Sequence, residues 1–327
     1  MSVETHTVSV VVPVYRGENT LRPLVEELLE LSGENITPDG HRYRVIEVVL
    51  VYDHGPDRSA ATMRALACDF PIVKPVWLAR NSGQHAATAA GIASSGGQWV
   101  ATLDEDGQHV PSDLALMLDA ALRNRTYLVY GRPTDGAPHS LWRNSSSKAA
   151  KSIASLVAGT DVSQFSSFRL IEGSRARSIT AYVGPHTYLD MALMWAIGAS
   201  CRCATTKRAE WRHESGYSVP ALVGHFWTLV LSSGTRPLRV VSLVGFVSAM
   251  FGFATAAVVV ARKLTSDYKA PGWASTVASQ LLMGGLILVS LGIVAEYIGE
   301  LLRSAQGKPL YIILQDPADG PIGDSAV

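Results

Sequence analysis

The sequence has little cysteine and no excess of either charge. It contains three cysteines in 327 residues, Cys68, Cys201 and Cys203. So few thiols exclude a disulfide-stapled scaffold, and the Cys-x-Cys spacing lacks the two-residue spacer of common zinc sites. The 28 basic residues are balanced by 28 acidic ones, so we expect no nucleic-acid partner. The N-terminus has no basic segment followed by an apolar core, and we therefore expect no signal peptide.

Charged residues are also missing from two long stretches near the C-terminus, residues 240–261 and 274–295. At roughly 1.5 Å per residue, a helix over either stretch reaches about 33 Å, enough for a hydrocarbon core of about 30 Å. The alternative is two buried helices of a soluble bundle, but such helices seldom run so long without a charge. The sequence therefore predicts a two-helix transmembrane hairpin within residues 238–299, preceded by a juxtamembrane amphipathic helix at residues 218–237.

Basic residues do not decide the orientation of this hairpin. They flank it on both outer sides and also occur in the loop between the two stretches, so the positive-inside comparison is close to a draw. The missing signal peptide favours a cytoplasmic N-terminal domain, and a hairpin returns the chain to the same side. We therefore expect residues 1–217 and the tail, residues 300–327, to be cytoplasmic, with a disordered segment after Gln315.

The first 217 residues alternate apolar strand patterns with amphipathic helical patterns. The strand patterns lie at residues 8–14, 45–51, 72–78, 99–103 and 128–130. Strands that alternate with helices at this spacing predict a Rossmann-like α/β domain with a mainly parallel sheet.

Two acids follow the strand predicted at residues 99–103. In an open α/β sheet, ligands bind in the crevice outside the carboxyl ends of the strands. Asp104 and Asp106, spaced i, i+2 at such an end, can share one hard cation, with Gln108 as a neutral oxygen ligand. Mg²⁺ and Mn²⁺ favour oxygen ligands and also bind substrate phosphates. A solvated acidic turn is the alternative for a bare Asp-x-Asp, but the strand before it and the helix after it favour a metal–phosphate site.

Six segments in order resemble one known family: VVPVYRGENTL, VVLVYDHGPDRS, LARNSGQHAATAAGI, TLDEDGQHVPSDL, SSFRLI and ESGYS. The chain resembles family 2 glycosyltransferases with the GT-A fold, and most of all the polyprenyl-phosphate glycosyltransferases of the dolichyl-phosphate mannose synthase and GtrB type. With the apolar hairpin and the closing KPLYII, the resemblance covers residues 8–314. It implies a GT-A catalytic domain that transfers a sugar, with inversion, from a nucleotide-diphosphate sugar to a polyprenyl phosphate. It further implies Mg²⁺ or Mn²⁺ as cofactor and a homo-oligomer.

The resemblance also implies which residues bind the donor and the metal. The positions that match the nucleotide-sugar contacts are Pro13, Tyr15, Glu18, Asp53, Asn81, Gln84 and Asp104. Asp104, Asp106 and Gln108 match the metal-binding Asp-x-Asp-x-Gln. Gly83 would let the backbone approach the diphosphate, and the N-terminus of the helix that begins at Gln84 favours an anion.

The lipid acceptor requires cations that can hold a phosphate. Guanidinium groups bind phosphate oxygens in a bidentate manner, so Arg132, Arg143 and Arg169 are candidates, and Ser215 and Tyr217 match the family's Ser-x-Tyr loop. The second pKa of a phosphate is about 6, so the nucleophilic oxygen is largely ionised at neutral pH and needs no strong base. The residues that the resemblance implies are catalytic are Asp104, Asp106 and Arg169.

Four positions depart from the family pattern: Gly17, Tyr52, Ser167 and Gly216. They favour one alternative, a catalytically weak or inactive homologue that acts as a nucleotide-sugar-binding membrane scaffold. A second alternative is a polysaccharide-synthase-type glycosyltransferase, but that class needs more membrane spans and a Gln-x-x-Arg-Trp motif, and the sequence has neither. The intact Asp-x-Asp-x-Gln favours the transferase.

Overall fold

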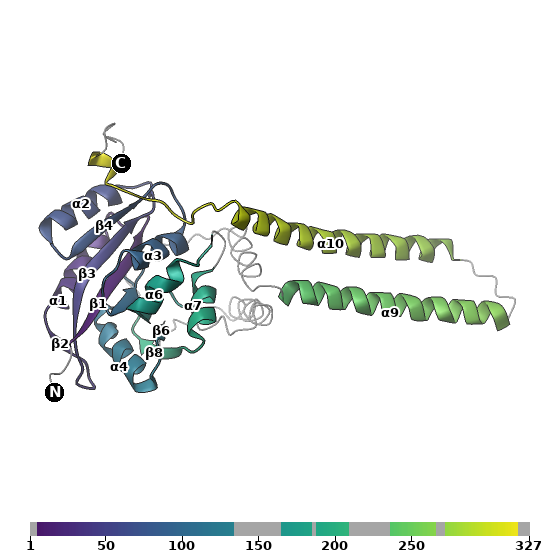
Figure 1. Cartoon of the computed structure of the whole chain (residues 1–327), viewed down its shortest axis with the longest axis horizontal. Coiled ribbons are helices and arrows are strands. Elements are labelled where there is room, and N and C mark those ends of the chain that lie inside the picture. The colour runs from purple at the N-terminus through teal and green to yellow at the C-terminus, as the bar shows by residue number, and fades with distance from the viewer. Residues whose placement is uncertain (1–4, 134–164, 185–187, 209–235, 266–271, 320–327) are drawn as a thin grey trace.

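The computed structural model describes residues 5–133, 165–184, 188–208, 236–265 and 272–319, which form an α/β domain and two long helices (Figure 1). The strands of the domain are β1 (His6–Val14), β2 (Asn35–Ile36), β3 (Arg42–Tyr52), β4 (Val73–Leu78), β5 (Trp99–Thr102), β6 (Leu128–Pro133), β7 (Arg169–Glu172) and β8 (Cys201–Thr205). Its helices are α1 (Leu21–Glu30), α2 (Ser59–Asp69), α3 (Gln84–Ala93), η1 (Pro111–Asp113), α4 (Leu114–Asn124), α6 (Gly173–Thr180) and α7 (Leu189–Ile197). The C-terminal part contributes α9 (Arg236–Thr265), α10 (Trp273–Ala305), β9 (Ile313–Leu314) and η3 (Pro317–Asp319).

The sheet has a parallel centre, which confirms the predicted α/β class. β1 pairs in parallel with β3 on one side and with β5 on the other, and β4 extends the parallel run beyond β3. β7 lies antiparallel between β5 and β6, so β6 again runs in the direction of β5. The carboxyl ends of β1, β3, β4, β5 and β6 therefore meet at one edge of the sheet.

Helices cover both faces of this sheet. α1, α2 and α4 pack on one face, where the apolar side of α1 buries Leu21, Leu24 and Leu28. α3, α6 and α7 pack on the other face. A side chain in place of Gly91 of α3 would meet the side chain of Val11 within 2.3 Å, so the small residues of α3 let this helix approach the sheet closely.

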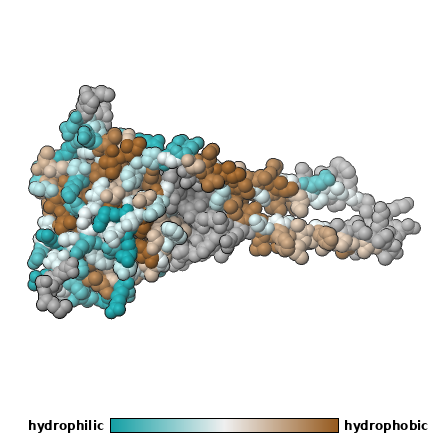
Figure 2. Space-filling model, viewed as in Figure 1, coloured by the Kyte–Doolittle hydropathy of each residue, from teal (hydrophilic) through white to brown (hydrophobic). Residues whose placement is uncertain are grey.

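α9 and α10 run side by side and extend away from the domain (Figure 1). In the part of the chain that the structure describes, one window, Leu282–Gly299 of α10, is long and apolar enough to cross a membrane, and none of it is buried. α9 contains a shorter apolar stretch, Val241–Thr255. Figure 2 shows hydrophobic residues along the exposed surface of the hairpin. The prediction of two full spans therefore remains a prediction, with α10 as its better supported half.

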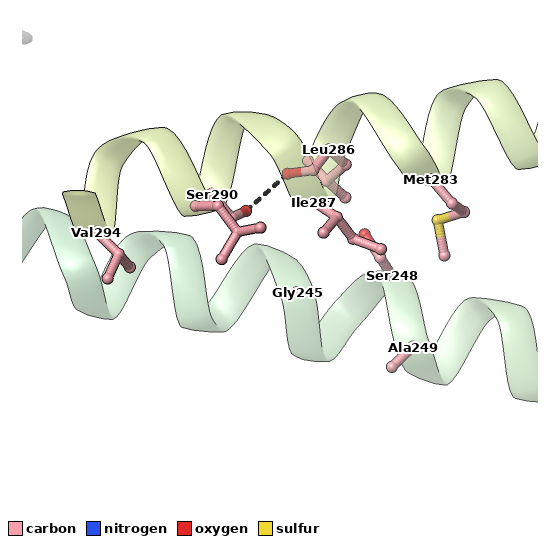
Figure 3. Close-up of a pocket in the computed structure, with 9 residues that line it drawn as sticks. Gly245, Ser248, Ala249, Met283, Leu286, Ile287, Ser290 and Val294 are labelled. Atoms are coloured by element: carbon pink, nitrogen blue, oxygen red, sulfur yellow. Dashed lines mark hydrogen bonds between the residues drawn. The ribbon is translucent and has the colours of Figure 1, made fainter. Parts of the chain in front are cut away.

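The facing sides of α9 and α10 line an open apolar groove of about 280 Å³ (Figure 3). Gly245, Ser248 and Ala249 of α9 face larger side chains of α10, such as Met283 and Ile287. On α10, the hydroxyl of Ser290, which also lines the groove, donates to the carbonyl of Leu286 at 2.8 Å. That polar group is thus satisfied within its own helix, as an apolar environment requires.

After α10 the chain returns to the sheet, which corrects the expectation of a disordered segment directly after Gln315. β9 pairs antiparallel with β4, and the amide of Ala79 donates to the carbonyl of Ile312 at 2.9 Å. Asp316 then accepts hydrogen bonds of 2.7 to 3.1 Å from the guanidinium of Arg64, which also lies over the ring of Trp77. Residues 306–319 thus form a C-terminal strap across the edge of the sheet.

We expect Asp316→Asn to loosen this strap and to remove its pH dependence. Arg64 holds the pKa of Asp316 below its usual range, so the ion pair stabilises the strap fully above the unfolded pKa of about 3.9 and loses this effect as the pH falls further. A partly exposed ion pair of this kind contributes at most about 1 kcal/mol. Hydrogen exchange at the β9 amides measures the effect. If these amides exchange as fast in the wild-type protein as in Asp316→Asn at pH 7, the stabilising role of the ion pair is contradicted. Glu34→Gln, in the exposed loop before β2, is the control.

Candidate active site

A pocket of about 430 Å³ opens at the sheet edge where the carboxyl ends of the parallel strands meet. Its lining comes from the segments that follow β1, β3, β4 and β5. The lining residues are Pro13, Val14, Tyr15, Asp53, Asn81, Gly83, Gln84, Asp104, Glu105 and Asp106. All predicted donor contacts except Glu18 therefore lie in one pocket, and both acids of the Asp-x-Asp lie beside them.

Asp53 shapes the wall of the pocket from the end of β3. Its carboxylate is 4% exposed and accepts hydrogen bonds from the backbone amides of Ser82 at 2.6 Å and Gly83 at 2.9 Å. Burial raises the pKa of Asp53, and these two amides oppose the rise. Gly83 has φ +86° with open space around it, a backbone conformation that favours glycine. Asp53 thus holds the loop that presents the N-terminus of α3 to the pocket.

Asp104 is fixed by two neighbours from other segments and one from its own loop. Gln84 donates to its Oδ1 at 2.6 Å, and the hydroxyl of Ser167 donates to its Oδ2. His109 lies near the same oxygen, with Nε2 at 3.8 Å. Burial alone would raise the pKa of Asp104, but His109 and Ser167 hold it below its usual range. This carboxylate is therefore ionised at neutral pH and held in one orientation.

Asp106 faces the pocket with fewer partners. Its Oδ1 accepts from the backbone amide of Gln108 at 3.0 Å. Burial raises its pKa, the backbone amide opposes the rise, and the charge of Asp104 adds to it. Two carboxylates that repel each other in a half-buried pocket form a site that a cation would stabilise.

The pocket residues suit a cation whose coordination is completed by the substrate. Among the described residues, no group of three or more His, Cys, Asp or Glu side chains is arranged to hold a metal by itself. Mg²⁺ and related ions usually bind through one or two carboxylates, with substrate phosphates and water as the remaining ligands. Asp104 and Asp106 provide these two carboxylates, so the residues present fit a divalent cation bound together with a diphosphate.

Glu105 is a pocket residue that the sequence interpretation missed. Its carboxylate crosses to the turn after β1 and accepts from the backbone amides of Tyr15 at 2.8 Å and Arg16 at 2.9 Å. Burial raises the pKa of Glu105 to about 7. The sequence does show an acid at the centre of Asp-Glu-Asp. Its role could not be predicted, because its partners belong to the turn after β1 and come close only in the folded domain.

Arg169 lies in a different environment from the one expected of it. Its guanidinium is buried, with Nε and Nη2 2.6 and 2.7 Å from the two carboxylate oxygens of Asp190. Nη1 donates to Thr102 and to the carbonyl of Ser167, both at 3.2 Å. This pairing neutralises the charge of Arg169 inside the domain, and its assignment to the acceptor phosphate stays a prediction. Arg169 also supports the segment that carries Ser167.

The other predicted residues fall into three groups. Glu18 and Gln108 lie close to the pocket in sequence but not in its lining. Arg132 is exposed at the end of β6. Three predicted acceptor residues lie outside the described residues: Arg143, Ser215 and Tyr217.

The structure also explains three of the four departures. Tyr52 is 2% exposed, and its hydroxyl donates to the carbonyl of Gly55 at 3.1 Å, so its ring is part of the core and not of the pocket. Ser167 contributes a hydrogen bond to Asp104. Gly17 lies in the turn held by Glu105. Gly216 is outside the described residues.

Comparison with known proteins gives two family matches and a set of relatives. Residues 9–194 match the model of glycosyl transferase family 2, and residues 236–301 match the GtrB C-terminal hairpin. An undecaprenyl-phosphate 4-deoxy-4-formamido-L-arabinose transferase of Edwardsiella ictaluri (strain 93-146) is 31% identical, over 94% of this chain and 93% of that protein. The protein of the same name from Pseudomonas paraeruginosa (strain DSM 24068 / PA7) is 30% identical, over 94% and 89%.

Among solved structures, glucosyl-3-phosphoglycerate synthase from Mycobacterium tuberculosis, in complex with Mn²⁺, UDP and glucosyl-3-phosphoglycerate, has a TM-score of 0.48 and 16% identity. The match covers 71% of this chain and 80% of that one. The family match spans more than half of the chain and includes every residue that lines the pocket. It confirms the predicted GT-A glycosyltransferase, and the hairpin match confirms the GtrB-like subset. The chain belongs to glycosyl transferase family 2 and carries a GtrB-type C-terminal hairpin.

Proposed function

We propose that this glycosyltransferase transfers a sugar from a nucleotide-diphosphate sugar to a polyprenyl phosphate, with inversion at the anomeric carbon. The observation that carries the proposal is the pocket at the carboxyl edge of the sheet, where two carboxylates, an exposed amide side chain and the start of α3 converge. The hairpin that follows the domain and the undecaprenyl-phosphate transferases among the relatives support a lipid acceptor.

On the donor side, the nucleotide would lie between the turn after β1 and the loop that Asp53 holds. Tyr15 is 40% exposed at the pocket and offers an aromatic face to a base or a ribose. α3 begins at Gln84 beside the pocket, and the N-terminus of a helix favours an anion such as the diphosphate. These groups orient the donor so that its anomeric carbon lies near Asp104 and Asp106.

We propose Mg²⁺ or Mn²⁺ as cofactor, held by Asp104 and Asp106. A bound divalent cation would neutralise the departing diphosphate as a Lewis acid. Gln84 and Ser167 fix the carboxylate of Asp104, so one of the two ligands is preorganised before the substrate arrives. An ionised acceptor phosphate needs no protein base, which agrees with a serine at position 167.

The acceptor phosphate would approach from the hairpin side of the pocket. The exposed apolar surface of α9 and α10 (Figure 2) suits a lipid bilayer, and we propose that both termini and the catalytic domain face the cytoplasm. The same apolar faces offer a surface for a homo-oligomer. Arg132 lies at the carboxyl end of β6, which runs in the direction of β5, and its guanidinium has no partner among the described residues.

The direct test uses membranes that contain the protein, polyprenyl phosphate, Mg²⁺ or Mn²⁺, and a panel of radiolabelled nucleotide sugars. We expect one label to move into the organic phase, and this transfer to be abolished by EDTA. NMR of the lipid product should show the sugar with the anomeric configuration opposite to that of the donor. If no label enters the lipid fraction, or if transfer is unaffected by EDTA, the corresponding part of the proposal is wrong.

Arg132→Ala should weaken binding of the acceptor more than binding of the donor. Loss of one charge-assisted contact to a phosphate raises the KM for polyprenyl phosphate about tenfold, equivalent to about 1.4 kcal/mol, and leaves the KM for the nucleotide sugar within about twofold. Steady-state kinetics in detergent measure both constants. Arg42→Ala, an exposed arginine at the opposite end of the sheet, is the matched control. A change confined to the donor KM would show that Arg132 is not an acceptor ligand.

A further inference from the structure

The turn after β1 depends on side chains from other segments for its shape. The amides of four consecutive residues, 15 to 18, donate to side-chain oxygens that lie elsewhere in the chain. Glu105 accepts from the first two amides at 2.8 and 2.9 Å, Ser59 accepts from the amide of Gly17 at 2.7 Å, and Asp57 accepts from the amide of Glu18 at 3.1 Å. Since a backbone N–H is a strong donor and each of these four has a defined acceptor, the acceptors fix the conformation of the turn.

Glu105 is the acceptor that comes from the Asp-x-Asp loop. It lies between the two proposed metal ligands, and the amide nitrogens that it binds belong to Tyr15, a pocket residue, and to Arg16. One carboxylate therefore links the metal-binding loop to the wall of the nucleotide pocket, across 90 residues of sequence.

Gly17 makes room for this carboxylate. A Cβ atom at position 17 would lie 2.9 Å from Oε2 of Glu105 and 2.7 Å from Cγ of Leu21. Contacts this short force one partner to move. Leu21 is fully buried in the core, so part of the adjustment falls on Glu105 and on the two hydrogen bonds that it accepts.

We infer that Glu105 is a positioning residue of the nucleotide site: its carboxylate holds the turn after β1 against the metal-binding loop, and Gly17 is the residue that admits it. The inference rests on the proposed function, because the turn lines the pocket assigned to the nucleotide. Loss of the carboxylate frees two amides and lets Tyr15 move, so the affinity for the nucleotide falls while the metal carboxylates stay in place.

The first test measures nucleotide binding by the full-length protein in detergent, by isothermal titration calorimetry with UDP and with GDP in the presence of Mg²⁺. We expect Glu105→Ala to raise the Kd of the nucleotide that binds the wild-type protein about tenfold, which is about 1.4 kcal/mol. Glu105→Gln keeps one acceptor oxygen and should have a smaller effect. Glu172→Ala is the matched control, because Glu172 also accepts from two backbone amides, those of Ser174 and Arg175, but outside the pocket. It should leave the Kd unchanged.

The second test is a double-mutant cycle between positions 17 and 105. In the wild-type background, we expect Gly17→Ala to raise the Kd about tenfold, because the new methyl group displaces Glu105. In the Glu105→Ala background, the same change should raise it only about twofold, since only the contact with Leu21 remains. Equal factors in the two backgrounds would overturn the inference, as would a Glu105→Ala protein that binds the nucleotide as tightly as the wild type.

The two levels of the argument fail in different ways. A wild-type protein that binds neither nucleotide, nor any other nucleoside diphosphate, would overturn the proposed function itself. A wild-type protein that binds one of them, together with additive effects in the cycle, would leave the proposed function intact and remove the positioning role of Glu105. If Glu105→Ala does not fold, Glu105→Gln and Gly17→Ala supply the same comparison.

Discussion

Asp106→Asn should reduce kcat by on the order of 10³-fold while the protein stays folded. Asp106 is the pocket carboxylate with fewer protein partners, and its charge is the one available to a cation that neutralises the leaving diphosphate. Several kilocalories per mole of transition-state stabilisation depend on such a ligand, and 10³-fold corresponds to about 4 kcal/mol. Asparagine keeps the oxygen that accepts from the amide of Gln108, so the turn should retain its shape.

The measurement is the initial rate of label transfer to lipid at saturating metal, together with the thermal midpoint of unfolding. Burial and the charge of Asp104 raise the pKa of Asp106, so removal of its charge should leave the midpoint unchanged or higher. Asp69→Asn, which alters a surface pair with Arg22, controls for the chemistry of the substitution. A turnover within about twofold of the wild type would show that the metal assignment is wrong.

Asp190→Asn should destabilise the domain by about 3 to 5 kcal/mol. Asp190 is 1% exposed, forms a bidentate pair with Arg169, and accepts from the hydroxyl of Tyr130 at 3.0 Å. Removal of one partner of a buried ion pair leaves an uncompensated charge in the interior, which costs an amount of this order. Asparagine has nearly the same volume as aspartate, so the loss of unfolding free energy reflects the missing charge and not a cavity.

Urea unfolding of the purified protein, followed by circular dichroism, measures the difference. Asp39→Asn removes the partner of Arg123 on the surface and should leave the midpoint nearly unchanged. The double variant Arg169→Met/Asp190→Leu should recover most of the lost stability, because it leaves no unpaired buried charge. A midpoint for Asp190→Asn equal to that of Asp39→Asn would contradict the buried pair. We also expect lower activity, since Arg169 supports the Ser167 segment that holds Asp104.

Much of the fold could be predicted from local patterns. β1 and β3 are mostly apolar, and α1 has apolar residues at helical spacing, so the type of each element can be predicted from a short window of sequence. β7 and β9 were missed because they are four and two residues long and are fixed by their neighbours in the sheet. The end of the C-terminal strap, after Gln315, was interpreted as disordered because its composition is that of a loop.

The candidate site shows the same division. Asp104 and Asp106 were found because the motif lies within three residues at the end of an apolar strand. Arg169 was predicted to bind a phosphate because an arginine in a recognisable motif suggests such a ligand, and its pairing inside the domain was not foreseen. Its actual partner, Asp190, lies 21 residues away on another element, and no spacing rule links the two.

The sequence by itself determined the alternation of the longer strands and helices in the first 130 residues, the acidic motif at a strand end, and the apolar hairpin, because periodicity and hydropathy are properties of neighbouring residues. The tertiary structure alone decided which charges are paired. Glu105 binds a turn 90 residues away, and Asp316 binds Arg64 across 252 residues. The physical reason is that the pairing of a charge depends on its distance to other groups in space and on its burial. Both are set only when the sheet brings distant segments together.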